Sequence, residues 1–75
     1  EAKNDYLNAA RQFQKAANTD KENPFVDQYL FYAAKDYFRA GDFDESKKLL
    51  DELKKDYPKS KYIAESERFR ASMKN

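Results

Sequence analysis

Two cationic side chains, Lys35 and Arg39, are the residues of this 75-residue chain whose types and spacing are best suited to binding a ligand. They are four residues apart, about one helical turn, so both would lie on the same face of a helix. Lysine and arginine so placed can donate charge-assisted hydrogen bonds to a carboxylate. Further residues share this face at helical spacing. The candidate partner-binding set is Gln28, Phe31, Lys35, Phe38 and Arg39.

The five candidate residues also have a purely structural interpretation. Phe31 and Phe38 would serve equally well as packing between helices, and Lys35 and Arg39 as ordinary solvated charges. Periodicity alone does not separate a partner surface from inter-helix packing, so both interpretations stay open at this point.

Catalytic and metal-binding chemistry finds little support in the sequence. The chain contains no histidine and no cysteine, so the commonest general base and two common metal ligands are missing. The acidic run 42–45 is too short for a calcium loop, which needs a twelve-residue series of ligands. Asp51 and Glu52 fall on a solvated helix face and not in an apolar pocket that would suit them to acid–base catalysis. We therefore expect no enzyme activity, no cofactor and no metal.

A second basic group surrounds Tyr57 and Tyr62, where aromatic and basic residues alternate. Its members are Lys54, Lys55, Lys59 and Lys61. Such a mixture can bind nucleic acid or phosphate. However, the whole chain has a net charge of only +1 although 39% of its residues are charged, which is typical of solvated helix faces. We interpret the lysines as favourable charge at a helix C-terminus and in an exposed turn, and predict no nucleic-acid partner.

Apolar periodicity predicts four helices and no strand. The expected spans are 3–18, 25–40, a third helix from Asp42 or Asp44 to about 57, and 61–73. The second is apolar around most of its circumference, so it must be contacted on more than one side. Gly41 suits the left-handed residue that ends it, and Asp42 with Glu45 has the spacing of a helix cap. Pro58 ends the third helix, and Ser60 is the predicted N-cap of the fourth.

A pattern of residues at helical spacing occurs twice in the chain, 37 residues apart. Tyr6, Ala9, Phe13 and Ala16 recur as Phe43, Ser46, Leu50 and Leu53. Between the copies lie Leu30-x2-Ala33-Ala34-x2-Tyr37 and then Gly41-Asp42-Phe43, and after them Tyr57-Pro58. This pattern resembles the tetratricopeptide repeat, whose unit is a helix pair of about 34 residues closed by proline. The resemblance departs at Leu30, where tryptophan is typical, at Ala33-Ala34 and at Ser46, all of which keep apolar or small character.

The resemblance implies an all-α fold of antiparallel helix pairs in a right-handed superhelical stack. The single domain 1–75 would comprise the second helix of a truncated repeat (1–23), one full repeat (24–60) and a closing helix (61–75). In peptide-binding members of the family the first helix of each pair lines a groove, which assigns the five candidate residues to a partner protein or peptide. The alternative is a structural module that self-associates weakly through its exposed helix faces.

The junction Tyr57-Pro58-Lys59-Ser60-Lys61-Tyr62 is similar to that of bacterial cell-envelope members, such as the coordinator of the Tol-Pal system and the outer-membrane assembly lipoprotein. This similarity implies a periplasmic or cell-envelope location. No apolar run approaches the length of a membrane span. Because the chain begins with Glu1 and not Met, we expect a processed protein or a piece of a longer one.

Overall fold

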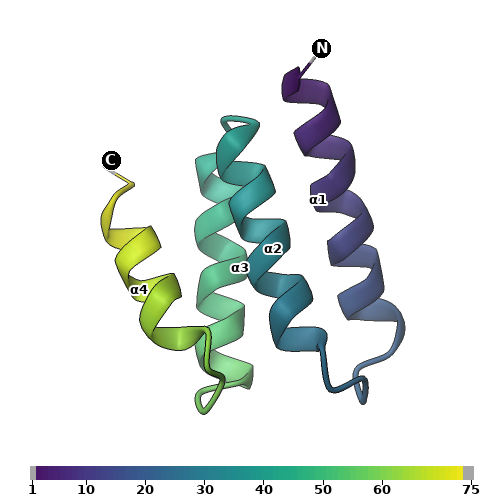
Figure 1. The fold of residues 1–75 in the computed structure, drawn as a ribbon, viewed down its shortest axis with the longest axis vertical. Coiled ribbons are helices and arrows are strands. Elements are labelled where there is room, and N and C mark those ends of the chain that lie inside the picture. The colour runs from purple at the N-terminus through teal and green to yellow at the C-terminus, as the bar shows by residue number, and fades with distance from the viewer. Residues whose placement is uncertain (1, 74–75) are drawn as a thin grey trace.

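A computed structural model describes residues 2–73 and has an all-α architecture. The helices are α1 (Ala2–Thr19), α2 (Val26–Arg39), α3 (Phe43–Asp56) and α4 (Ile63–Ala71), and residues 2–73 contain no strand. Consecutive helices run antiparallel (Figure 1). The predicted four-helix, all-α fold is confirmed. Of the predicted domain 1–75, residues 1, 74 and 75 lie outside the described part of the chain.

The turn between α2 and α3 forms as its sequence predicts. Gly41 has a φ of 89°, a left-handed conformation that costs glycine little. The Asp42 amide donates to the Tyr37 carbonyl at 2.9 Å and the Gly41 amide donates to the Phe38 carbonyl at 3.0 Å, the two bonds of a Schellman motif. Asp42 then caps α3, since its carboxylate accepts from the Glu45 amide at 3.1 Å.

Helix α2 is the centre of the hydrophobic core. It packs against α1 on one side and α3 on another, and its aromatic rings reach α4. Its buried apolar residues are Val26, Leu30, Phe31, Ala33, Ala34 and Tyr37. This burial confirms the expectation that a helix apolar around most of its circumference is contacted on more than one side.

Polar side chains inside this core have partners. The hydroxyl of Ser46, which is fully buried, donates to the Ala34 carbonyl at 2.7 Å and joins α3 to α2. The Tyr37 hydroxyl donates to Gln14 of α1 at 2.6 Å, and the Gln14 amide donates to Glu45 of α3 at 3.4 Å. Gln14 therefore links the three longer helices.

Helix α4 is shorter than the predicted span 61–73, and the predicted cap at Ser60 is wrong. Tyr62 occupies the N-cap position without a side-chain cap. The Ser60 hydroxyl instead donates to the Asp27 carboxylate at the start of α2 and accepts from the Tyr62 amide at 3.1 Å. This tertiary contact holds Ser60 in the loop, so the helix begins at Ile63, two residues later than predicted.

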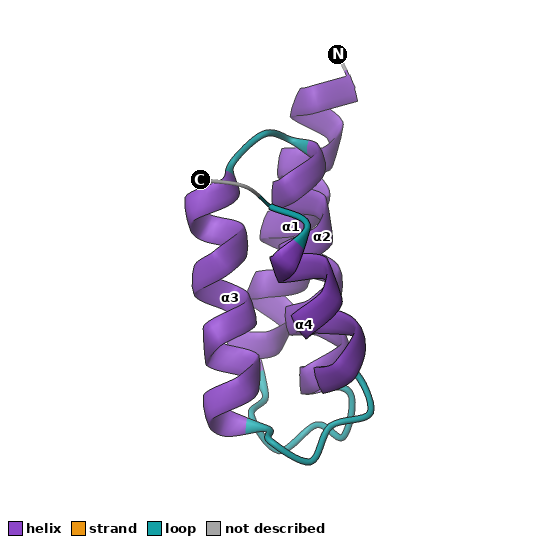
Figure 2. Ribbon diagram, turned by 90° about the vertical axis from the view of Figure 1, so that its left-hand side faces the viewer, coloured by secondary structure: helices purple, strands orange, loops and turns teal. Residues whose placement is uncertain are grey.

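The two helical hairpins, α1–α2 and α3–α4, have the same arrangement of helices and loop, offset by 37 residues. The first helices end at Thr19 and Asp56, and the second helices begin at Val26 and Ile63. Their loops make matching backbone bonds, Asn23 to Asp20 and Ser60 to Tyr57. Both loops lie at the same end of the molecule (Figure 2). The unit is three residues longer than the usual 34-residue tetratricopeptide repeat.

Truncating the core around α2 should destabilise the protein. Leu50 and Tyr37 are 3% and 5% exposed, so Leu50→Ala and Tyr37→Ala should each lower the free energy of unfolding by about 2–5 kcal/mol. The exposed Lys48→Ala on the same helix as Leu50 is the control and should stay within about 0.5 kcal/mol. Urea unfolding followed by circular dichroism measures all three. Wild-type stability in both core variants would contradict this core.

Candidate functional site

All five predicted site residues lie on α2, but the fold divides them between two sides of it. Lys35 and Arg39 border a hollow between α1 and α2. Phe31 and Phe38 contact Phe69 of α4 instead. Gln28 is half-buried in the first turn of α2. The fold thus keeps the two cations at one hollow, while the rings of Phe31 and Phe38 pack toward α4.

The sequence left two interpretations of Phe31 open, and the structure supports packing between helices. It is only 2% exposed, and its ring stacks on that of Tyr62 with 5.2 Å between centroids. The Phe69 ring stands edge-on to it at 6.4 Å. Phe31 therefore offers no free surface to a partner, because the arrival of α4 covers the side of α2 on which it lies.

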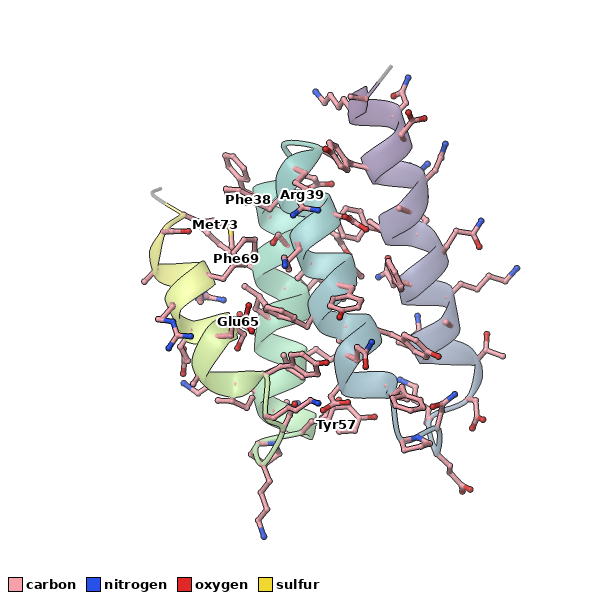
Figure 3. The ribbon with its side chains drawn as sticks, in the orientation of Figure 1. Phe38, Arg39, Tyr57, Glu65, Phe69 and Met73 are labelled. Atoms are coloured by element: carbon pink, nitrogen blue, oxygen red, sulfur yellow. The ribbon has the colours of Figure 1, made fainter. Side chains whose placement is uncertain are left out.

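Phe38 also packs between helices, near the C-terminal end of α2. Its ring lies 5.0 Å from that of Phe69 and 5.2 Å from that of Phe43, measured between centroids. Figure 3 shows Phe38, Phe69 and Met73 gathered where α2 meets α4. The side chain is half-buried, so this cluster joins the core at its edge.

The hollow beside Lys35 and Arg39 has a volume of about 310 Å³. Its other lining residues are Phe13 of α1, and Tyr32 and Asp36 of α2. The Phe13 and Tyr32 rings meet edge to face, 5.5 Å apart and at 71°. An apolar floor with cations at its edge suits a ligand that carries both an apolar group and a carboxylate.

Both cations also lie over aromatic rings, which restricts where they point. Lys35 Nζ is 5.4 Å from the centroid of the Phe31 ring, and the Arg39 guanidinium is 5.8 Å from that of Tyr6. Cation–π contacts of this length contribute about 0.5–1 kcal/mol at exposed sites. The two charges are thereby positioned at the same hollow.

Asp36 lies between the two cations along the sequence, and together with Phe13 and Tyr32 it is one of three lining residues of the hollow that the predicted site did not include. It is 9% exposed, and its carboxylate is 3.7 Å from the Arg39 guanidinium. Burial raises the pKa of Asp36 above its usual value, while the charges of Arg39 and Lys35 act in the opposite direction. The two cations and this one carboxylate leave the hollow with a formal charge of +1. The i, i+3 spacing of Asp36 and Arg39 was the signal that could have revealed it.

A larger hollow of about 480 Å³ lies at the end of the molecule that carries the two equivalent loops. Lys59 of the basic group lines it, but so do Glu22, Asp27 and Asp56. Lys54, another member of that group, forms an ion pair with Glu67 of α4 at 2.9 Å. The lysines around Tyr57 and Tyr62 therefore do not form a single basic surface.

Comparison of the chain with protein-family models, with curated proteins and with solved structures gave no significant match. Within residues 2–73, no helix combines the length and the apolar character needed to cross a membrane. The same residues contain no group of three or more acidic side chains arranged to hold a metal ion.

The raised pKa of Asp36 predicts a pH-dependent effect of Asp36→Asn. In the wild type, ionising this buried carboxylate costs stability as the pH rises through its folded-state pKa. Asp36→Asn should therefore melt at a higher temperature than the wild type at neutral pH. The difference should vanish below about pH 3.9, the pKa of an unfolded aspartate, where both side chains are uncharged. Thermal melts across this range test it, and a neutral-pH melting temperature below that of the wild type would contradict it.

Because Phe38 packs between helices, Phe38→Ala should destabilise the protein. We expect a loss of about 2 kcal/mol, less than the 3–5 kcal/mol typical of a fully buried phenylalanine. Phe25→Ala is the matched control, because Phe25 is 55% exposed. Urea unfolding of both variants measures the difference. Equal free energies of unfolding for the two variants would contradict the packing role and favour Phe38 as part of a partner surface.

Proposed function

We propose that this chain is a protein–protein interaction module of the tetratricopeptide kind, acting as a scaffold or adaptor without catalytic activity. Its binding site is the hollow between α1 and α2, and the segment it binds brings a carboxylate to Lys35 and Arg39. The observation that carries the proposal is the position of these two cations, which share one hollow with the rings of Phe13 and Tyr32. Phe31 supports the site through its contact with Lys35, and Phe38 packs against α4.

The repeated hairpin supports this proposal. Arrays of helix pairs expose extended surfaces on which partners are held, and the 37-residue period of α1–α2 and α3–α4 is of this type. The chemistry of the hollow also suits binding, because guanidinium and ammonium groups recognise carboxylates through charge-assisted hydrogen bonds.

Self-association is the second candidate function, and exposed aromatic rings favour it. Tyr6, Phe25 and Phe43 are 38%, 55% and 43% exposed, a set of apolar side chains that a second copy would cover. Light scattering on the purified chain separates the two candidates, because self-association requires a dimer mass without any partner.

Reversing the charge of the hollow should abolish partner capture without unfolding the protein. Arg39 is exposed and Lys35 half-buried, so neither substitution opens a cavity, but removing the cations beside the buried Asp36 carboxylate should lower the free energy of unfolding by about 1–3 kcal/mol. An acidic ligand would then meet like charge. Tagged wild type and double variant are compared by quantitative mass spectrometry of proteins captured from an extract of the source cells. Lys47→Glu with Lys48→Glu on α3 is the control for charge alone. Identical captured sets in wild type and double variant would refute the site.

A further inference from the structure

The hairpin α3–α4 holds α2 through four positions. Phe43 and Ser46 of α3 contact Phe38 and Ala34, at 5.2 Å between ring centroids and 2.7 Å for the hydrogen bond. From the other half of the hairpin, Tyr62 lies 5.2 Å from Phe31, and Phe69 lies 5.0 Å from Phe38. The receiving positions are Phe43, Ser46, Tyr62 and Phe69.

The hairpin α1–α2 repeats these four positions, 37 residues earlier. The equivalents are Tyr6, Ala9, Phe25 and Tyr32, so an aromatic or small residue recurs at each one. Here, however, no helix of residues 2–73 packs on these four positions in the way that α2 packs on α3–α4. Phe25 is 55% exposed where its equivalent Tyr62 stacks on Phe31, and Tyr6 is 38% exposed. Ala9 is half-buried, whereas its equivalent Ser46 is fully buried.

We propose that this face, formed by Tyr6, Ala9, Phe25 and Tyr32, seats a helix of a partner protein in the way that α3–α4 seats α2. The inference rests on the proposed function and specifies the partner's structure. The helix would present two large apolar residues seven positions apart, as Phe31 and Phe38 are, with a small residue between them in the place of Ala34. Anchors at such spacing lie on one face of a helix.

The charges beside the face specify an acidic helix. Tyr32 belongs to the face and also lines the hollow that Lys35, Asp36 and Arg39 border. Arg39 lies over the ring of Tyr6, another member of the face. Since this rim has a formal charge of +1, a glutamate or aspartate beside the apolar anchors of the partner helix complements it.

A second copy of this chain fits the face poorly. In a stack that continued the 37-residue period, α4 of the second copy would take the place that α2 has on α3–α4. Arg68 and Ala71 of α4 then stand where α2 has Phe31 and Ala34. An arginine would replace the main aromatic anchor and approach Lys35 and Arg39, which carry the same charge.

The α2 segment provides the probe, because it already fills the equivalent seat. We would titrate the chain with a labelled peptide of residues 26–39 carrying Lys35→Glu, and follow fluorescence anisotropy and circular dichroism. Lys35 covers the Phe31 ring, so this change puts a carboxylate beside the anchor. A free helix of 14 residues is marginal in water, so seating should add helical signal. The control peptides carry Phe31→Ala with Phe38→Ala, or retain Lys35.

Matched variants of the chain locate the binding. Phe25→Ser and Tyr6→Ser should each raise the dissociation constant of the acidic peptide about tenfold or more, as loss of an interface anchor does. Phe43→Ser is the control, because Phe43 is also exposed but lies outside the proposed face. The Ala-substituted peptide should bind at least tenfold more weakly, and the peptide retaining Lys35 should also bind more weakly than the acidic one.

Three results would overturn the inference. The first is that the acidic peptide does not bind, and the second is that it binds the Phe25→Ser and Phe43→Ser variants equally well. The third is that the wild-type chain forms a dimer that Phe25→Ser dissociates. The third would assign the face to a second copy. If the peptide does not bind but the Lys35→Glu, Arg39→Glu variant still loses captured proteins, the helical occupant is refuted and the proposed function stands.

Discussion

The burial of α2 is the constraint on which the rest of the structure depends. Leu30 and Tyr37 lie on one face of this helix and Phe31 lies about 100° round from them, and each is at most 5% exposed. Fully burying a large apolar side chain stabilises a protein by about 1.5–3 kcal/mol, so no single neighbouring helix could satisfy α2. Helices α1, α3 and α4 must therefore assemble around it, and the small size of the domain makes each of these contacts important.

Polar groups near the core are arranged to preserve that burial, with one exception. Ser46 and Tyr37 both donate hydrogen bonds across helix boundaries, so their desolvation is compensated. Asp36 is the exception, because burial raises its pKa and its nearest cation is 3.7 Å away. It lies in the hollow beside Lys35 and Arg39. A local conflict with stability at a candidate binding site is where one is expected.

The two sides of the helical stack differ in chemistry. The contact between α3 and α4 includes ion pairs, Lys54 with Glu67 and Asp51 with Arg70, and the exposed face of α4 carries Arg68. The opposite side exposes the rings of Tyr6 and Phe25. The aromatic side therefore has the character of an unfinished contact, and the candidate hollow borders it.

The sequence by itself determined the four helices, the turn at Gly41 and Asp42, and the central position of α2, because these follow from local periodicity, capping and φ preferences. It also placed Lys35 and Arg39 one turn apart. Only the tertiary structure decided that Phe31 is core, since its burial depends on Tyr62 and Phe69, more than thirty residues away. The start of α4 and the burial of Asp36 were likewise set by neighbours distant in sequence. A helical pattern fixes which residues share a face, but the partner that covers that face is chosen by packing of the whole chain.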